Sequence, residues 1–297
     1  MKFGVSHSPH QWWTKTEQFE EWILKVEEMG YDGIFVPDHY NLPFPPKASL
    51  VDAWTTLSYI AAKTSTVKIG SLVSPVPRWL PSQLAKIIAS VDILSRGRVI
   101  AGFGAGFYQD EFVNYAPSGS FDDPRVRLER LLEGVKLILE LWTKENVNFE
   151  GKYYTLKKAL LYPKPIQKPH PPIWCGGRRQ RILEITARYF NGWVPSIFEV
   201  PKNFDISASV ISSPEEYGSC VERIKGLFRK FGREETSFTF GILGEVNFDF
   251  DLIEKYRVAG CQYYIVDVVP PGKQIPKPTE CLGLTEKFAK EVMPSFK

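Results

Sequence analysis

Residues 69 to 106 contain two apolar strands separated by one helical pattern. The strands are IGSLVSP (69–75) and RVIAGFGAG (98–106), and both end in small residues that leave room for a flat ligand. Between them, the apolar residues of 85–94 recur at the spacings that place them on one face of a helix. A strand, a helix and a second strand within about forty residues predict a parallel crossover unit.

The same alternation of short apolar runs and helical patterns continues along the chain. Eight runs are predicted as strands: 2–6, 33–36, 67–73, 99–104, 172–175, 192–194, 238–243 and 263–268. Eight such units in 297 residues predict an α/β fold of the (β/α)8 TIM-barrel type, which typically takes about 250 residues. We expect a single domain over residues 1–297.

The surplus length is assigned to insertions at the C-terminal face of the barrel. They are expected near 107–123, 146–171 and 196–213. Within the second, VNFEGKYYTL (147–156) is typical of a β-hairpin that turns at Glu150 and Gly151. Loops of this kind form walls and lids over a barrel's active site.

Composition favours a soluble enzyme and excludes several other classes. The chain is 43% hydrophobic and 24% charged, with a net charge of only +3, which argues against a dedicated nucleic-acid surface. Apolar runs of membrane length are absent, and MKFGVSHSPHQWW lacks the apolar core of a signal peptide. We therefore expect a cytoplasmic protein with no membrane partner.

The common catalytic and metal-binding motifs are missing. The four cysteines are too far apart for a CxxC pair and are expected to be buried, and the four histidines form no HExxH, so no metal is expected. GFGAGF (102–107) would need glycine at Phe107 to complete the dinucleotide fingerprint GxGxxG, and an irregular segment follows it. A Rossmann site is therefore not predicted.

Functional groups of a TIM barrel gather at the C-terminal ends of its strands. In chain order, the first five strands lead to Ser8 and His10, to Asp38 and His39, to Ser71, Leu72 and Ser74, to Gly104 and Gly106, and to Gly176, Gly177 and Arg178. We expect these residues to cluster at one mouth of the barrel.

Five segments, in this order, resemble the bacterial luciferase-like superfamily of flavin and deazaflavin oxidoreductases. They are GIFVPDHY (33–40), IGSLVSPVPRWLPSQLAK (69–86), SRGRVIAGFGAGFYQDEF (95–112), RLERLLEGVKLILELW (127–142) and KPHPPIWCGGRRQRILEITARYFNGW (168–193). The last segment is most similar to the branch that uses coenzyme F420, a deazaflavin. The resemblance implies hydride transfer between coenzyme F420 and a small organic substrate, in a homodimer.

Two alternatives to this function stay open. One is a two-component monooxygenase that uses flavin mononucleotide (FMN), takes up oxygen and depends on a partner flavin reductase. The other is a flavin-binding barrel without catalysis.

The resemblance also implies a set of cofactor contacts. The ring stacks over a bulge in the third strand that contains a non-prolyl cis peptide, and alignment on Pro75 places this bond between Ser71 and Leu72. The residues expected around the cofactor are Asp38, His39, Ser71, Leu72, Val73, Gly104, Ala105, Gly106, Cys175, Gly176, Gly177, Arg178 and Arg179.

Asp38 and His39 match the family's Asp-His pair at the redox edge of the ring and are the expected catalytic residues. An imidazole there can hydrogen-bond the cofactor or substrate and relay a proton near neutral pH. The alternative is a turn in which Asp38 caps backbone amides.

Arg178, Arg179 and Arg181 stand where a helix is predicted to begin, which is unfavourable for cations because that helix end is already positive. A bound anion resolves the conflict, and both cofactors carry a phosphate. The alternative is a set of solvated surface arginines.

One position departs from the family pattern. The deazaflavin-dependent sugar-phosphate dehydrogenases carry a catalytic Glu directly after the glycines of the fourth strand, where this chain has Phe107. Oxidation of glucose 6-phosphate is therefore not expected. Asp110 and Glu111 lie nearby, either as acids or as solvated residues of a short helix.

Overall fold

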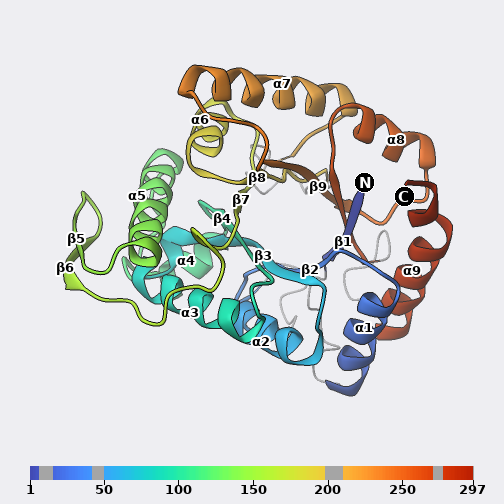
Figure 1. Cartoon of the computed structure of the whole chain (residues 1–297), viewed down its shortest axis with the longest axis horizontal. Coiled ribbons are helices and arrows are strands. Elements are labelled where there is room, and N and C mark those ends of the chain that lie inside the picture. The colour runs from blue at the N-terminus through green and yellow to red at the C-terminus, as the bar shows by residue number, and fades with distance from the viewer. Residues whose placement is uncertain (7–15, 42–49, 198–209, 270–276, 297) are drawn as a thin grey trace.

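The computed structural model describes residues 1–6, 16–41, 50–197, 210–269 and 277–296. Within them, eight parallel strands close into a barrel surrounded by helices (Figure 1). Around the ring the strands are β1 (Lys2–Ser6), β2 (Gly33–Val36), β3 (Lys68–Pro75), β4 (Val99–Gly104), β7 (Ile173–Cys175), β8 (Gly192–Trp193), β9 (Thr239–Glu245) and β10 (Tyr263–Asp267). Lys2 pairs with Tyr263 to close the ring. The predicted (β/α)8 barrel is confirmed.

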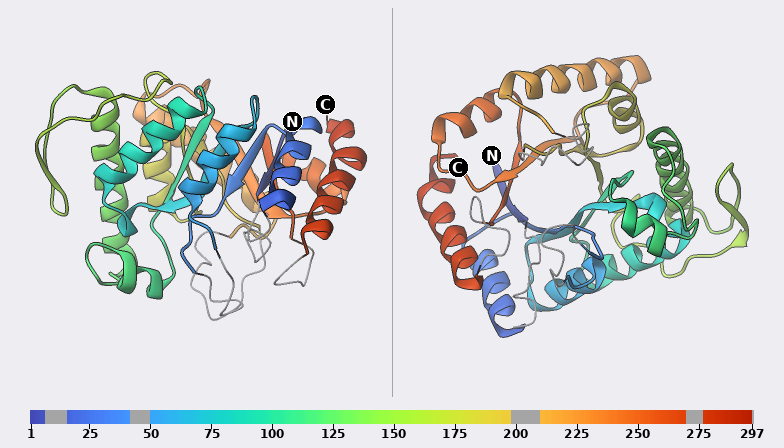
Figure 2. Two further views of the ribbon diagram at one scale, coloured as in Figure 1. Left: turned by 90° about the horizontal axis from the view of Figure 1, so that it is seen from below. Right: turned by 180° about the vertical axis from the view of Figure 1, so that it is seen from behind.

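Helices form the outer layer of the barrel (Figures 1 and 2). They are α1 (Thr16–Glu28), α2 (Ala53–Lys63), α3 (Pro81–Leu94), α5 (Pro124–Thr143), α6 (Gln180–Tyr189), α7 (Pro214–Phe231), α8 (Phe250–Val258) and α9 (Pro278–Glu291), with a short α4 (Gln109–Tyr115) and the 3-10 turns Val76–Arg78 and Met293–Phe296. The helix expected over 85–94 begins earlier, at Pro81, because proline suits the first helical position.

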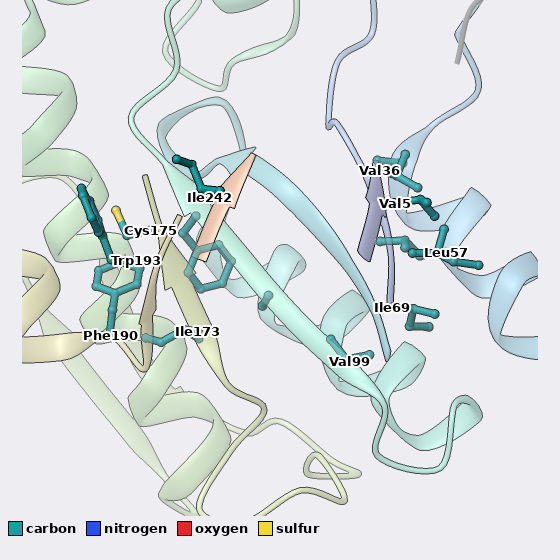
Figure 3. Packing of buried hydrophobic residues seen from close by; sticks show 14 of the residues in the cluster. Val5, Val36, Leu57, Ile69, Val99, Ile173, Cys175, Phe190, Trp193 and Ile242 are labelled. Carbon is teal, nitrogen blue, oxygen red and sulfur yellow. The ribbon is translucent and has the colours of Figure 1, made fainter. Parts of the chain in front are cut away.

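Alternation along the strands divides the apolar core into two parts. One face of each strand packs against the helices, and Figure 3 shows Val5, Val36 and Leu57 gathered at one side of the barrel wall. The other face fills the interior of the barrel with a separate cluster that includes Phe35, Trp174 and Tyr263. All four cysteines are free and buried, as predicted.

The predicted hairpin forms, and it lies outside the barrel. Strands β5 (Val147–Glu150) and β6 (Thr155–Ala159) pair antiparallel, and the Glu133 carboxylate of α5 accepts hydrogen bonds from the backbone amides of 152–154 in their connection. The hairpin projects beyond α5 in Figure 1.

The insertion over 146–171 is not at the C-terminal face where we expected it. It follows helix α5 and precedes strand β7, and a connection from a helix to the next strand reaches the N-terminal ends of parallel strands. The insertion over 107–123 does follow a strand, lies at the C-terminal face and contains α4. Of 196–213, residues 198–209 lie outside the described residues.

Among the described residues, none of the helices is both long and apolar enough to cross a membrane.

Candidate functional site

A bulge in β3 shapes the C-terminal mouth of the barrel. Ser71 pairs with Ala101 of β4 and Ser74 with Phe103, so three steps along β3 match two along β4. A non-prolyl cis peptide joins Leu72 to Val73, one bond later than the predicted Ser71–Leu72 position. The prediction was wrong by one residue because Ser71 still keeps its place in the ladder with Val36 and Ala101, so the irregular bond falls after it.

Buried hydroxyl groups hold this bulge from behind. Ser71 Oγ donates to the Gly102 carbonyl at 3.0 Å, and Ser74 Oγ donates to Ser71 Oγ at the same distance. Trp54 Nε1 in turn donates to Ser74 Oγ. A Cβ on Gly102 would lie 2.0 Å from the Ser71 carbonyl oxygen, so only glycine fits there. The Ser71 side chain therefore supports the bulge, and Leu72 and Val73 are the residues that it presents to the barrel interior.

Asp38 follows β2 and is buried against two donors. Its Oδ1 accepts from Arg78 Nη2, and its Oδ2 accepts from Trp79 Nε1 at 3.0 Å. Burial raises the pKa of Asp38 above its ordinary value, and the charge of Arg78 only partly offsets this. Both carboxylate oxygens are thus bound to protein groups.

His39 is held by a carboxylate from α4. Its Nδ1 lies 3.1 Å from Glu111 Oε2, and its ring meets Phe107 edge-on at 5.5 Å. Burial raises the pKa of Glu111, but the His39 hydrogen bond, the Arg78 charge and the Tyr40 amide outweigh it, so the pKa lies below the ordinary value. An ionised carboxylate only accepts, so Nδ1 carries the proton and Nε2 stays available to a ligand.

Arg78 joins the two carboxylates. Its Nη1 donates to Glu111 Oε2 at 2.7 Å while Nη2 donates to Asp38, and its guanidinium lies 4.1 Å from the centre of the Tyr40 ring. Asp38, Arg78 and Glu111 are each at most 2% exposed. The result is a buried carboxylate–guanidinium–carboxylate unit with the His39 imidazole at its edge.

Sequence reasoning did not single out Arg78, and it left open whether Glu111 is solvated. The structure excludes a solvated Glu111, since its side chain is only 1% exposed. Both residues stand in segments that carry the family resemblance, but the pairing itself joins positions 33 residues apart.

The glycines after β4 lie against the bulge. A Cβ on Gly104 would be 2.6 Å from Val73 Cγ2, and Gly106 has a φ of +77°, which glycine adopts without strain. Ala105 between them is partly buried. The structure thus places Gly104 against Val73, and Gly106 against Phe112 and Pro75.

The turn after β7 lies beside β4 in the ring, since Phe103 pairs with Cys175. Burial raises the pKa of the Cys175 thiol to about 12, so this residue is inert. Gly177 has a φ of +97°, and its carbonyl accepts from Trp193 Nε1 at 2.6 Å, while Gly176 leads into it.

The arginines that follow Gly177 stand at the start of α6. Arg178 Nη1 contacts Glu216 Oε1 at 2.9 Å, and exposed Arg179 precedes the first residue of the helix. Arg181 Nη2 lies 3.6 Å from Glu129 Oε1. Arg178 and Arg181 thus have carboxylate neighbours, whether or not an anion binds there.

Ser8 and His10 lie outside the described residues. In the part of the chain that is described, no three His, Cys, Asp or Glu side chains are grouped as metal ligands.

The closed barrel and the polar cluster of Asp38, His39, Arg78 and Glu111 at its C-terminal mouth are typical of a TIM-barrel enzyme. The family model described as luciferase-like monooxygenase matches residues 1–251, and the chain belongs to this family.

Curated relatives include an F420-dependent glucose-6-phosphate dehydrogenase of Kineococcus radiotolerans, 32% identical over 196 residues, covering 65% of this chain and 56% of that protein. A protein of the same name from Amycolatopsis mediterranei is 37% identical over 182 residues, covering 60% and 52%. The chain thus spans about half the length of these relatives.

Among solved structures, an F420-dependent secondary alcohol dehydrogenase in complex with an F420-acetone adduct has a TM-score of 0.79 at 18% identity, covering 100% of this chain and 99% of that one. This likeness shows the shared fold.

Proposed function

We propose that this chain is an oxidoreductase that transfers a hydride between coenzyme F420 and a small organic substrate. The observation that carries the proposal is the His39 imidazole, fixed by Glu111 beside the β3 bulge at the barrel mouth. The F420-dependent relatives named above support the choice of cofactor.

The residues at the mouth fit a flat ring. The bulge presents Leu72 and Val73 to the barrel interior, and the absence of a Cβ on Gly104 lets Val73 Cγ2 pack closely against this glycine. In the proposal, Leu72, Val73, Gly104, Ala105 and Gly106 hold the ring, and the turn 175–179 holds the phosphate through its glycine amides and Arg178 and Arg179. When bound, the deazaflavin accepts or donates the hydride; the protein supplies position and proton handling.

His39 has the geometry of the proton-handling residue. Because Glu111 fixes the proton on Nδ1, Nε2 is the atom that takes a proton from a substrate hydroxyl or returns one to a carbonyl. Asp38 acts through Arg78, which it orients toward Glu111, and is therefore proposed as a positioning residue. Sugar-phosphate substrates are not proposed, because Phe107 stands where those dehydrogenases carry their catalytic Glu.

The Gly104→Ala variant tests the proposed ring site. The new methyl group would meet Val73 Cγ2 at 2.6 Å and displace the Val73 side chain, which is proposed to hold the ring, so we expect affinity for coenzyme F420 to fall about tenfold or more. Gly283→Ala is the matched control, since its added methyl group meets nothing within 4 Å. Equal affinities in the two variants would remove Gly104 from the cofactor site.

The function itself is tested by titrating the purified chain with coenzyme F420 and separately with FMN, following fluorescence quenching. We expect tight binding of the deazaflavin, and hydride transfer without oxygen consumption when alcohols, enones and imines are screened. Preference for FMN with oxygen uptake would instead establish the monooxygenase alternative, which the description of the family favours. Cofactor binding without any turnover would point to a non-catalytic barrel.

The proposal includes a homodimer, as the family resemblance implies, and a location in the cytoplasm. The near-balanced net charge of +3 supports the absence of a nucleic-acid partner. Light scattering coupled to size-exclusion chromatography measures the mass that tests the dimer.

A further inference from the structure

A pocket opens at the N-terminal end of the barrel. Its volume is about 770 Å³, and its lining includes Lys2, Lys68, Thr239 and Tyr263, each the first residue of its strand. It therefore lies at the N-terminal face, opposite the mouth that holds His39; Figure 2 (left) shows the strands running between the two ends. Known ligand pockets have volumes of about 300–1,000 Å³.

The rim of this pocket carries an excess of positive charge. Lys2, Lys68 and Lys168 line it together with one carboxylate, Asp32. Lys68 Nζ donates to the Gly97 carbonyl and Lys168 Nζ to the Pro165 carbonyl, each at 3.2 Å, and no ion pair of the three lysines occurs among the described residues. Backbone carbonyls thus hold two of these ammonium groups in place without neutralising them.

The charges disturb one another. Burial lowers the pKa of Lys68, and the charge of Lys2 lowers it further. Asp32, whose Oδ2 accepts from the Phe3 amide at 2.8 Å, is one carboxylate against three lysines, so it offsets only part of their repulsion. An anion between the lysines would relieve it.

The floor of the pocket is aromatic and contains an unused donor. Ile100, Trp174 and Tyr263 form it, with the Trp174 and Tyr263 rings edge to face at 5.4 Å. Tyr263 is only 2% exposed, and its hydroxyl has no hydrogen-bond partner among the described residues. A buried hydroxyl without a partner is destabilising, and a bound acceptor atom would recover this loss.

We propose that this pocket binds a small organic anion, with its carboxylate or phosphate between Lys2, Lys68 and Lys168 and its flat apolar body against Trp174 and Tyr263. The Tyr263 hydroxyl donates to an acceptor atom of the ligand. This site is separate from the redox site and does not depend on the proposed function.

Calorimetric titration at low ionic strength with benzoate and with phenyl phosphate tests this site. We expect saturable binding of at least one probe, weakened about tenfold by Lys68→Met and about threefold by Tyr263→Phe. Benzyl alcohol, which has the same ring without the charge, should not bind. Whichever probe binds more tightly identifies the anionic group.

Lys157→Met is the matched control, because Lys157 is exposed on β6 outside the barrel. If Lys157→Met weakens probe binding as much as Lys68→Met does, the effect comes from the overall charge of the protein and the proposed site is wrong. Undiminished probe binding in Lys68→Met would also overturn the proposed site. The absence of saturable binding to wild-type protein by both probes would also overturn it. His39→Ala should bind the probe as wild type does, which separates this pocket from the catalytic mouth.

Discussion

Replacement of His39 by alanine is expected to lower kcat by about 10²–10⁴-fold while the affinity for coenzyme F420 stays within about threefold. The imidazole is fixed through Nδ1 by Glu111, and Nε2 is the atom left for a reacting hydroxyl or carbonyl. Removal of the ring therefore removes proton transfer in the transition state but not the glycines and bulge that hold the cofactor. Steady-state kinetics with a substrate found in the alcohol, enone and imine screen, together with cofactor titration, gives both quantities.

The matched control is His170→Ala, which removes an imidazole from the N-terminal face. Its turnover should equal that of the wild type. If His39→Ala loses cofactor affinity and turnover in the same proportion, His39 is a binding residue and the proton-handling role is wrong.

The barrel could be predicted because its strands are short apolar runs with a regular order. Each predicted strand begins and ends within two residues of an observed one, including the most irregular, β3, which continues through its bulge to Pro75. Periodicity identifies an element but carries no information on register. The cis bond, which was placed by alignment on Pro75, was misplaced by one residue, since only the pairing of Ser71 with Ala101 locates the bulge.

The site was only partly predictable for a related reason. Asp38 and His39 were found because they follow a strand and match a family pair. Arg78 and Glu111 act through contacts between separate elements, and a charged residue near a helix start is ordinarily solvated. Their burial is decided by the packing of α4 over the barrel mouth, which no local pattern records.

The insertion over 146–171 illustrates a different failure. The order of elements already indicated its place, because a segment between a helix and the following strand lies at the N-terminal face of a parallel barrel. Assigning it to the catalytic mouth treated length as a sign of function. Its residues Lys168 and His170 instead line the pocket at the opposite end.

Arg78→Met is expected to destabilise the fold by about 3–5 kcal/mol near pH 8, because it leaves two buried carboxylates without their shared cation. The cost should diminish in acid. Burial already raises the pKa of Asp38, and loss of the guanidinium raises it further. In the folded variant Asp38 then keeps a proton that it releases above about pH 4 in the unfolded chain. The stability of the variant therefore falls as pH rises from the pKa of Asp38 in the unfolded chain to its higher pKa in the folded variant.

Urea denaturation at pH 5.5 and pH 8 measures this dependence. Arg125→Met is the control, because the Arg125 side chain is 80% exposed beside Glu129 and its loss should not change the stability measurably. A variant that carries Asp38→Asn and Glu111→Gln in addition to Arg78→Met keeps the volumes but removes the stranded charges. It should be more stable at pH 8 than Arg78→Met alone, and this comparison remains possible if the single variant is largely unfolded. If neutralisation gives no recovery, Arg78 stabilises the mouth through packing against Tyr40, not through charge.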